Sequence, residues 1–363
     1  MKRLLSTSVV AVLLVASACS GSSEPTTTSG SSTTSSTMSS TTAVTTTTAA
    51  PTTSSSTTVA PTTSSSTTVA PTTSSTTTVA PVDLSTLSFS VGVGDDGVAY
   101  DLDGSPPSGP TSFAVLDDGS VVIADTMAVD RGEPRLLHYD RTGEPLAVLD
   151  LADEEVASIV DVVTDGSNLA ILDVLVSMNR YRVLMLSVAG DVAAVVDIPQ
   201  GFRFEDGLTG LTWDDSGILL EFEFGARHAR LTDGAPESPA LPVFDGESIE
   251  LIPGSGRTTE VVTSRTSFPV ERATDLGGVT VIGIAPDGSI VLVVDEVDLS
   301  GEAIAVTRRV QRYSATGEFM AESVVDAADQ FLDIQRPFEL DATGQVLYLQ
   351  AGSDRVTVAV IEQ

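Results

Sequence analysis

The folded part of this 363-residue chain is predicted to be all-β, on two observations. Short runs of Val, Ile, Leu and Phe alternate with Asp-Gly, Thr-Gly or Ser-Gly turns, and no stretch keeps a 3.6-residue apolar period for three turns. One strand–turn–strand pattern also recurs along the chain. It is clearest from Phe113 to Asp125, with its turn at Gly119, and it returns at 159–173, 208–223, 282–295 and 338–350.

A second hairpin follows several of these patterns, at 135–149, 181–196 and 306–321. Two hairpins make four antiparallel strands, which is the blade of a β-propeller. The turn glycines stand at positions 119, 166, 217, 288 and 344, with spacings of 47, 51, 71 and 56 residues. We predict six blades within 83–363, with five or seven as alternatives. The rival fold is a row of β-sandwich domains, but a spacing near fifty is about half of such a domain.

Two regions depart from the regular repeat. The 71-residue spacing predicts a degenerate blade or a long insertion, with strand candidates at Ser248–Ile252 and Thr258–Thr263. An N-terminal strand, at Leu87–Val91 or Val98–Leu102, is expected to complete the blade that begins at Phe338, because closing the ring removes exposed sheet edges.

The repeating unit resembles an NHL-type propeller repeat. The likeness is clearest from Phe113 to Gly143, through Asp118-Gly119, Ala124-Asp125-Thr126 and Tyr139-Asp140 followed by Thr142-Gly143. The other units keep only the glycine turns and the apolar strands. The resemblance therefore covers most of 110–350 as a pattern and one unit as a motif.

The connections within a predicted blade differ in length. The turns between strands one and two and between strands three and four are tight, whereas the connections from strand two to strand three are longer, at 126–134, 174–180 and 296–303. In a four-stranded meander these two sets lie at opposite ends. Long loops on a rigid scaffold usually carry binding residues, so we predict that the functional face is the one with the longer connections.

A polar residue ends the second strand of each recognised unit: Asp125, Asp173, Glu223, Asp295 and Gln350. If these side chains point toward one mouth of the channel, their carboxylates suit a hard cation such as Ca²⁺. In NHL-like repeats, however, an aspartate at this position commonly hydrogen-bonds backbone within its own blade. The four acidic residues are thus candidates for a metal or ligand ring, with a within-blade role as the alternative.

Other catalytic and cofactor signals are weak. Gly92-Val-Gly94-Asp-Asp-Gly97 fits G-x-G-x-x-G, but a strand follows it and its aspartates would repel a pyrophosphate. No G-x-S-x-G nucleophile motif is present. His138 and His228 lie in expected strands, where packing is the commoner role. No catalytic residue and no cofactor other than the hypothetical Ca²⁺ is predicted.

The charge balance limits the partners. The chain has 50 acidic and 18 basic residues, a formal net charge of −32. Such a surface repels phosphate backbones, so nucleic acid is disfavoured as a partner, and anionic lipid headgroups are equally poor ligands. With Cys19 as the single cysteine, no intrachain disulfide can form. We expect a monomer.

The first nineteen residues have the order of an export signal. Lys2 and Arg3 precede a short apolar stretch, and small residues Ala16-Ser17-Ala18 precede Cys19. The segment resembles a bacterial lipoprotein signal, which implies a signal peptide at 1–18, a lipid on Cys19 and a location on the outer face of the cell membrane. Because Ala16 stands where that family prefers Leu, ordinary cleavage with secretion is an alternative, and an uncleaved anchor is another.

A stalk is predicted at 19–82. Ser and Thr make up 43 of the 62 residues from Ser20 to Pro81, and a ten-residue unit beginning at Ala50 repeats from Ala60 and Ala70. Such a segment has no apolar face to bury and is expected to be disordered. It could carry O-linked sugar or serve as an unmodified spacer.

Two functions follow from these features. The first is a cell-envelope lipoprotein whose propeller binds an extracellular protein, peptide or glycan without catalysis, with its N-terminal lipid in the membrane. The alternative is a metal-dependent envelope hydrolase of the gluconolactonase type, which would need the carboxylate ring and, usually, Asn ligands. The predicted domain contains only Asn168 and Asn179, which weighs against the hydrolase.

Overall fold

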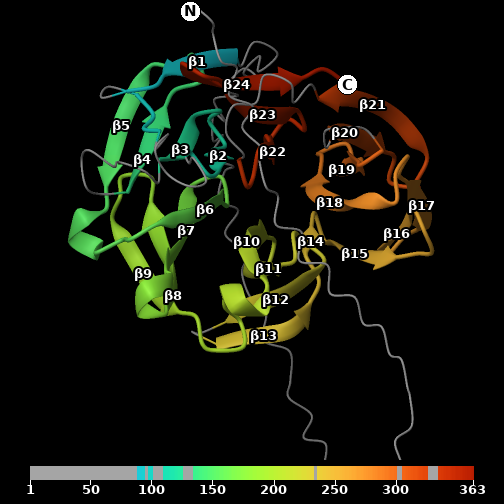
Figure 1. Ribbon diagram of the computed structural model, residues 1–363, viewed down its shortest axis with the longest axis horizontal. Coiled ribbons are helices and arrows are strands. Elements are labelled where there is room, and N and C mark those ends of the chain that lie inside the picture. The colour runs from blue at the N-terminus through green and yellow to red at the C-terminus, as the bar shows by residue number, and fades with distance from the viewer. Residues whose placement is uncertain are drawn as a thin grey trace, which may run out of the picture. The chain divides into compact units, whose positions relative to one another are not determined.

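The computed structural model describes residues 88–94, 97–100, 109–125, 134–232, 235–300, 305–325 and 334–363. They belong to one compact unit, Pro81–Gln363, and form six antiparallel sheets of four strands each. The sheets are arranged around a common centre (Figure 1). The structure is therefore a six-bladed β-propeller, as the sequence predicted. The predicted signal peptide (1–18), Cys19 and the whole of the predicted stalk (19–82) lie outside the described residues.

The blades are numbered in chain order, and their strands are given from the innermost outward. Blade one consists of β2 (Phe113–Val115), β3 (Val121–Asp125), β4 (Arg135–Tyr139) and β5 (Pro145–Asp150). Blade two consists of β6 (Ile159–Thr164), β7 (Asn168–Leu175), β8 (Arg180–Ser187) and β9 (Val192–Asp197). Blade three consists of β10 (Leu208–Asp214), β11 (Gly217–Phe222), β12 (Arg227–Thr232) and β13 (Ala235–Ala240).

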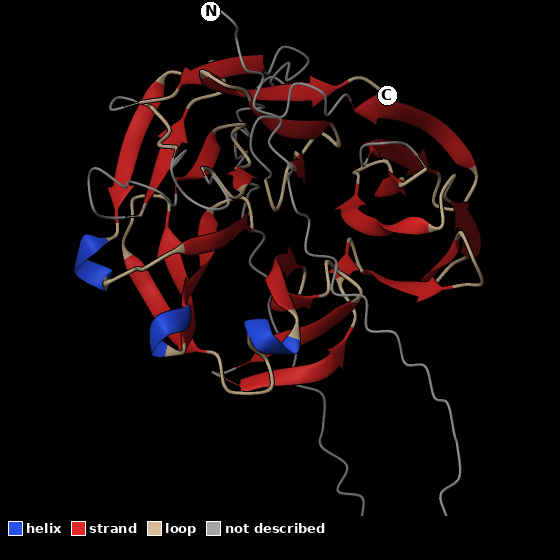
Figure 2. Ribbon diagram, viewed as in Figure 1, coloured by secondary structure: helices blue, strands red, loops and turns tan. Residues whose placement is uncertain are grey.

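The second half of the ring has the same order. Blade four is β14 (Val243–Phe244), β15 (Glu247–Pro253), β16 (Thr258–Thr263) and β17 (Ser267–Glu271); blade five is β18 (Leu276–Ile284), β19 (Ile290–Asp298), β20 (Ala305–Tyr313) and β21 (Phe319–Val325); blade six is β22 (Phe338–Leu340), β23 (Val346–Ala351), β24 (Arg355–Ile361) and β1 (Ser88–Gly92). The helices among the described residues are three single 3₁₀ turns: η1 (Ala152–Glu154), η2 (Val176–Met178) and η3 (Phe204–Asp206) (Figure 2).

The tight turns are built by aspartate and glycine together. In blade one, Asp118 Oδ1 accepts hydrogen bonds from both the backbone N–H and the hydroxyl of Ser120, and Gly119 takes the left-handed conformation at φ 80°. Blade five repeats this arrangement with Asp287, Gly288 and Ser289. An Asx turn satisfies backbone donors locally, and glycine adopts the positive φ without strain, which is why the same residues form the first hairpin of both blades.

The ring is closed by its two ends. β1 pairs with β24 in antiparallel register, from Ser88 opposite Ala359 to Gly92 opposite Arg355. The first of the two predicted N-terminal strands is thus confirmed as the outer strand of blade six. Because β1 precedes blade one in the chain, this pairing joins blade six to the start of the ring and covers the outer edge of β24.

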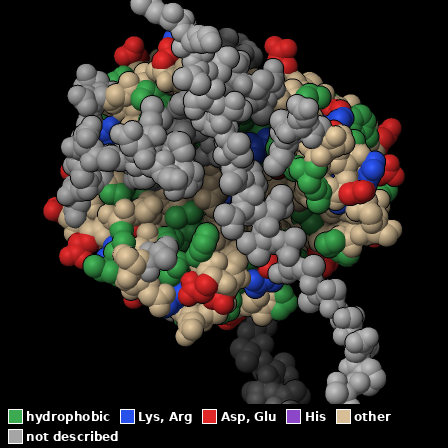
Figure 3. All heavy atoms as spheres, viewed as in Figure 1, with side chains coloured by type: hydrophobic (Ala, Val, Ile, Leu, Met, Phe, Trp, Pro, Cys, Tyr) green, Lys and Arg blue, Asp and Glu red, His purple; other side chains and the backbone are tan. Residues whose placement is uncertain are grey.

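Apolar clusters hold neighbouring blades together. Five interfaces contain such a cluster within the described part of the chain: six with one, one with two, two with three, four with five, and five with six. They form because successive strand residues face opposite neighbours, so Ile171 packs toward blade one while Leu172 packs toward blade three. Acidic side chains are distributed around the rim of the face in Figure 3.

Blade four is the degenerate blade that the 71-residue spacing predicted. Both strand candidates are confirmed, as β15 and β16. The sequence analysis missed its turn glycine, Gly246. The outer hairpin of blade three, β12 and β13, was also not predicted.

Candidate functional site

The two ends of the propeller differ as the connection lengths indicated. In each meander the turns between the first and second strands and between the third and fourth strands lie at one end, which we call the turn end. The connections between the second and third strands lie at the opposite end, which we call the loop end. Of the three longer connections, only 174–180 is fully described, and it contains η2.

Asp125 and Asp173, two of the four acidic ring candidates, are buried and held within their own blades. Asp125 accepts hydrogen bonds from Arg135 Nε at 2.8 Å and from the Ala99 backbone N–H at 3.0 Å. Asp173 accepts from Arg182 Nε at 2.8 Å. It also accepts from the backbone N–H groups of Ala157 and Ser158, at 2.8 and 3.1 Å. Both aspartates are fully buried.

The other two candidates are arranged differently. Asp295 accepts from Arg308 Nε at 3.1 Å, so the same cross-strand aspartate–arginine pair occurs in blades one, two and five. Glu223 lies beyond the end of β11, in the turn, with a left-handed φ of 53° and an exposed side chain. Among the described residues, no three His, Cys, Asp or Glu side chains gather in a group that could hold a metal ion. The structure therefore does not bring the four candidates together, and Ca²⁺ binding remains a prediction.

An arginine spans the space inside the ring instead. Arg336 precedes β22 of blade six, and its Nε lies 3.1 Å from both carboxylate oxygens of Asp161 on β6. Its Nη2 lies 2.9 Å from Glu221 Oε2 on β11 and also donates to the backbone carbonyl of Leu211 on β10. Its backbone N–H donates to Thr111 beside β2. One side chain and its backbone thus connect blade six to blades one, two and three.

Charges in this network change one another's protonation. Burial opposes the charge of Arg336, but Asp161, Glu221 and Glu339 together raise its pKa. Burial raises the pKa of Glu339 to about 8, Arg336 lowers it, and the charges of Asp161 and Glu221 raise it further. Burial likewise raises the pKa of Asp161, against the effect of Arg336. The sequence analysis missed this network, although a charged residue within the apolar run 159–163 was a signal for it.

The inner strand of blade four is a stub. β14 has two residues and makes two register pairs with β15, Val243 with Ser248 and Phe244 with Glu247. It is fixed near the turn end of blade three, where the Val243 N–H donates to Asp214 at 2.8 Å and the Asp215 N–H donates to the Val243 carbonyl at 2.9 Å. Beyond the stub, β15 becomes the innermost strand of its blade.

The interface between blades three and four, which we call the seam, differs from the other five interfaces in its packing. No apolar cluster joins these blades within the described ranges. The face of blade four turned toward blade three carries Glu250, Ile252, Glu260, Pro269 and Glu271, all exposed. Alternation of the strands puts the blade's buried apolar residues on the opposite face, toward blade five.

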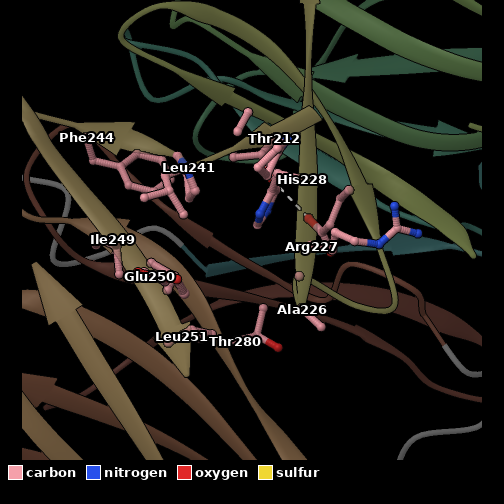
Figure 4. A pocket seen from close by; sticks show the side chains of 16 residues that line it. Thr212, Ala226, Arg227, His228, Leu241, Phe244, Ile249, Glu250, Leu251 and Thr280 are labelled. Atoms are coloured by element: carbon pink, nitrogen blue, oxygen red, sulfur yellow. Dashed lines mark hydrogen bonds between the residues drawn. The ribbon is translucent and has the colours of Figure 1, made fainter. Parts of the chain in front are cut away.

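A cavity of about 150 Å³ lies at the seam. It is lined by residues of three blades: Thr212, Glu221, Gly225, Ala226, Arg227, His228, Pro239 and Ala240 from blade three, Leu241, Pro242, Phe244, Ile249, Glu250 and Leu251 from the connection and blade four, and Thr280 and Val281 from blade five. Figure 4 shows the His228 ring directed into this space and the Arg227 side chain directed away from it. A cavity of this size accommodates a benzene-sized group.

The polar groups around the cavity are few and specific. Burial lowers the pKa of His228, although Glu221 acts in the opposite direction, so its imidazole is neutral at pH 7. Glu221 accepts from the Thr212 hydroxyl at 3.0 Å and belongs also to the Arg336 network. On the side toward blade five, the Thr280 hydroxyl lies 3.5 Å from the Phe224 carbonyl, so a turn of blade three reaches past blade four.

His138 and Trp213 have structural roles. His138 is 9% exposed and its Nε2 lies 2.9 Å from the Ser120 hydroxyl. Trp213 packs against the cluster between blades two and three. Sequence reasoning gave His228 the same packing role, whereas the structure places it in the cavity wall.

No family model matches the chain, and no curated protein sequence matches it. Among solved structures, a member of the DUF4221 family from Bacteroides vulgatus is 8% identical, with a TM-score of 0.47 over 76% of this chain and 96% of that one. A catalytically inactive virginiamycin B lyase from Staphylococcus aureus with quinupristin is 12% identical, with a TM-score of 0.40 over 76% and 99%. Both TM-scores lie below 0.5, so the fold assignment rests on this chain's own strand order.

Asp173→Asn tests whether the aspartate–arginine pairs are structural. Removing one partner of a buried pair leaves the other charge uncompensated, so we expect a loss of roughly 3 kcal/mol, or about 6–12 °C in thermal unfolding. The matched control is Asp275→Asn, whose pair with Arg257 is exposed and should leave the unfolding temperature unchanged. A Ca²⁺-dependent rise in the wild-type unfolding temperature that Asp173→Asn abolishes would contradict the structural role and support the metal ring.

Glu339→Gln tests the channel network through pH. Because the folded-state pKa of about 8 lies above the ordinary 4.5, the contribution of Glu339 to stability is complete below pH 4.5 and is lost as the pH rises through 8. We expect the unfolding temperature of the wild type to fall between pH 6.5 and 8.5, and that of Glu339→Gln to fall less. His228 does not confuse this window, because a lowered pKa affects stability below pH 6.5. Parallel pH profiles for wild type, Glu339→Gln and the exposed control Glu318→Gln would refute this expectation.

Proposed function

We propose that this chain is a cell-envelope lipoprotein whose β-propeller binds a protein partner without catalysing a reaction. The observation that carries the proposal is the seam. Five blade interfaces are closed by apolar packing, and the sixth contains a cavity with a few polar groups, an exposed acidic face and a strand edge without a partner among the described residues. An opening of this kind in an otherwise sealed ring is a surface for recognition.

The position of the cavity supports the same function. It is bordered by the turn at Gly225–Arg227, which lies at the loop end of blade three. This is the end that the connection lengths indicated as functional. A stalk of Ser and Thr repeats would give the propeller distance from the membrane, and a lipid on Cys19 would retain the chain at the membrane surface.

The alternative function, a metal-dependent envelope hydrolase, would need free carboxylates around the channel. Three of its four candidate ligands, Asp125, Asp173 and Asp295, form ion pairs with arginines of their own blades. The carboxylates of Asp161 and Glu221 inside the ring are paired with Arg336. These contacts favour binding over metal-assisted hydrolysis.

Cys19→Ser tests the location. The wild-type protein is expected in the membrane fraction, with a lipid mass on the peptide that begins at Cys19. The variant should appear in the medium, because Ala16-Ser17-Ala18 still suits ordinary signal cleavage. Fractionation with mass spectrometry of the N-terminal peptide makes the measurement. An unmodified Cys19 in a wild-type protein already found in the medium would contradict lipidation and indicate plain secretion.

Site-specific photo-crosslinking tests the binding role. A photoreactive residue at Ile252, which is 40% exposed in the seam, should give a discrete protein adduct in the cells that produce this chain. The same residue at Val148, which is 56% exposed on β5, is the matched control and should give none. Equal labelling from both positions, or none from Ile252, would count against a partner at the seam. A protease-resistant adduct would indicate a glycan instead.

A further inference from the structure

We infer that the seam is a docking groove for an extended, basic segment of a partner protein, which adds to the sheet of blade four along the inner edge of β15. This inference rests on the proposed binding function and specifies its partner. It depends on two separate features of the described residues: an unpaired strand edge and the charge of the face beside it.

The hydrogen bonds of β15 show which of its groups face the open edge. The Ile249 N–H donates to the Pro242 carbonyl at 3.0 Å, so it points away from β16. Its register partner Thr263 likewise donates away from β15, to the Thr266 carbonyl at 2.8 Å. Because backbone groups alternate along a strand, the N–H and C=O of Leu251 also point to the inner edge. Neither group of Leu251 has a hydrogen-bond partner there among the described residues.

The edge is short and bounded. It begins where β14 stops, opposite Ser248, and Pro253 ends it because proline has no N–H to donate. Within the described part of the chain, the groups without a partner between these limits are the carbonyl of Ile249 and both backbone groups of Leu251. They match about five residues of an added strand, which is the main-chain recognition used in strand addition.

The negative charge beside the open edge favours a basic partner segment. Glu250, Glu260 and Glu271 are exposed on the face of blade four turned toward blade three, and none of the described strand residues on that face is basic. Of the arginines of blade three, Arg227 lies over the Phe222 ring, with its guanidinium carbon 4.4 Å from the ring centroid, and is directed away from the cavity (Figure 4). Arg230, which also reaches the Leu241 carbonyl at 3.4 Å, is neutralised by a bidentate pair with Asp214. A partner segment with Lys or Arg is therefore complementary, whereas an acidic segment is repelled.

The two sides of the groove also determine which side chains are expected along the partner segment. A residue opposite Leu251 shares its face, toward Val281 and blade five, and should be apolar. The next residue faces blade three, where Glu250 and the neutral His228 line a cavity with room for one side chain. The expected segment thus alternates apolar and basic or polar residues.

Binding of a synthetic peptide tests this inference. The probe is the acetylated and amidated peptide Thr-Val-Arg-Val-Thr carrying a fluorophore, titrated with the full mature chain bearing Cys19→Ser and followed by anisotropy. We expect saturable binding. N-methylation of both valine amides, which face β15 in this arrangement, should weaken binding at least tenfold. N-methylation of the arginine amide, which faces away, is the matched control and should change it less than twofold.

Variants of the chain test the charge. Glu250→Gln should weaken binding of the peptide about tenfold, whereas Glu271→Gln, an exposed glutamate on the same face but on the outermost strand, should change it less than twofold. Both side chains are exposed, so neither variant should affect folding. Equal effects of the two N-methylated peptides, or of the two glutamate variants, would overturn strand addition at this edge.

The outcome also separates this inference from the proposed function. A protein adduct from Ile252 together with no peptide binding would leave the binding function standing and refute the strand-addition mode. Peptide binding only after removal of residues 20–81 would mean that the chain's own stalk fills the groove, and this would overturn the proposal of a partner segment. Peptide-independent dimerisation in sedimentation, lost in Glu250→Gln, would assign the groove to a second copy and likewise overturn it.

Discussion

Each sheet in a ring of blades has two faces to bury, and the ring closes only when neighbouring faces match. Strand alternation meets this demand in five interfaces, where residues such as Leu136 and Leu184 pack between blades one and two. At about 25 cal/mol per Å² of apolar area, these clusters are the main source of stability. The pairing of β1 with β24 depends on them, because it joins chain ends more than 260 residues apart.

Blade four is the exception, because no apolar cluster joins it to blade three within the described residues. Its buried apolar residues pack at the interface with blade five, and its other face carries exposed residues. On the inside of the ring, Arg336 connects blade six to blades one, two and three by charge-assisted hydrogen bonds. Glu221 belongs both to this network and to the cavity wall, so the seam and the channel share one carboxylate.

The propeller architecture could be predicted from the sequence because each hairpin is formed by residues close together in the chain. The Asp-Gly turns, the apolar runs and their spacing predicted six blades, the closing strand and the irregular fourth blade. Contacts between distant parts of the chain could not be predicted in this way. Asp161 and Arg336, for example, are 175 positions apart, and no spacing rule relates them. The four acidic ring candidates were chosen by position along their strands, but that position also faces an arginine on the next strand, as Asp125 faces Arg135. The register decides between these roles, and it is visible only in the folded sheet.

Amide hydrogen exchange at β15 tests the central claim, that the inner edge of blade four is open, most directly. In an uncovered edge strand, alternate amides are free. We predict fast exchange of the Leu251 amide and slow exchange of the Glu250 and Ile252 amides, which point toward β16. Slow exchange at all three positions would show that the edge is covered within the protein itself, and it would contradict both the seam and the function proposed for it.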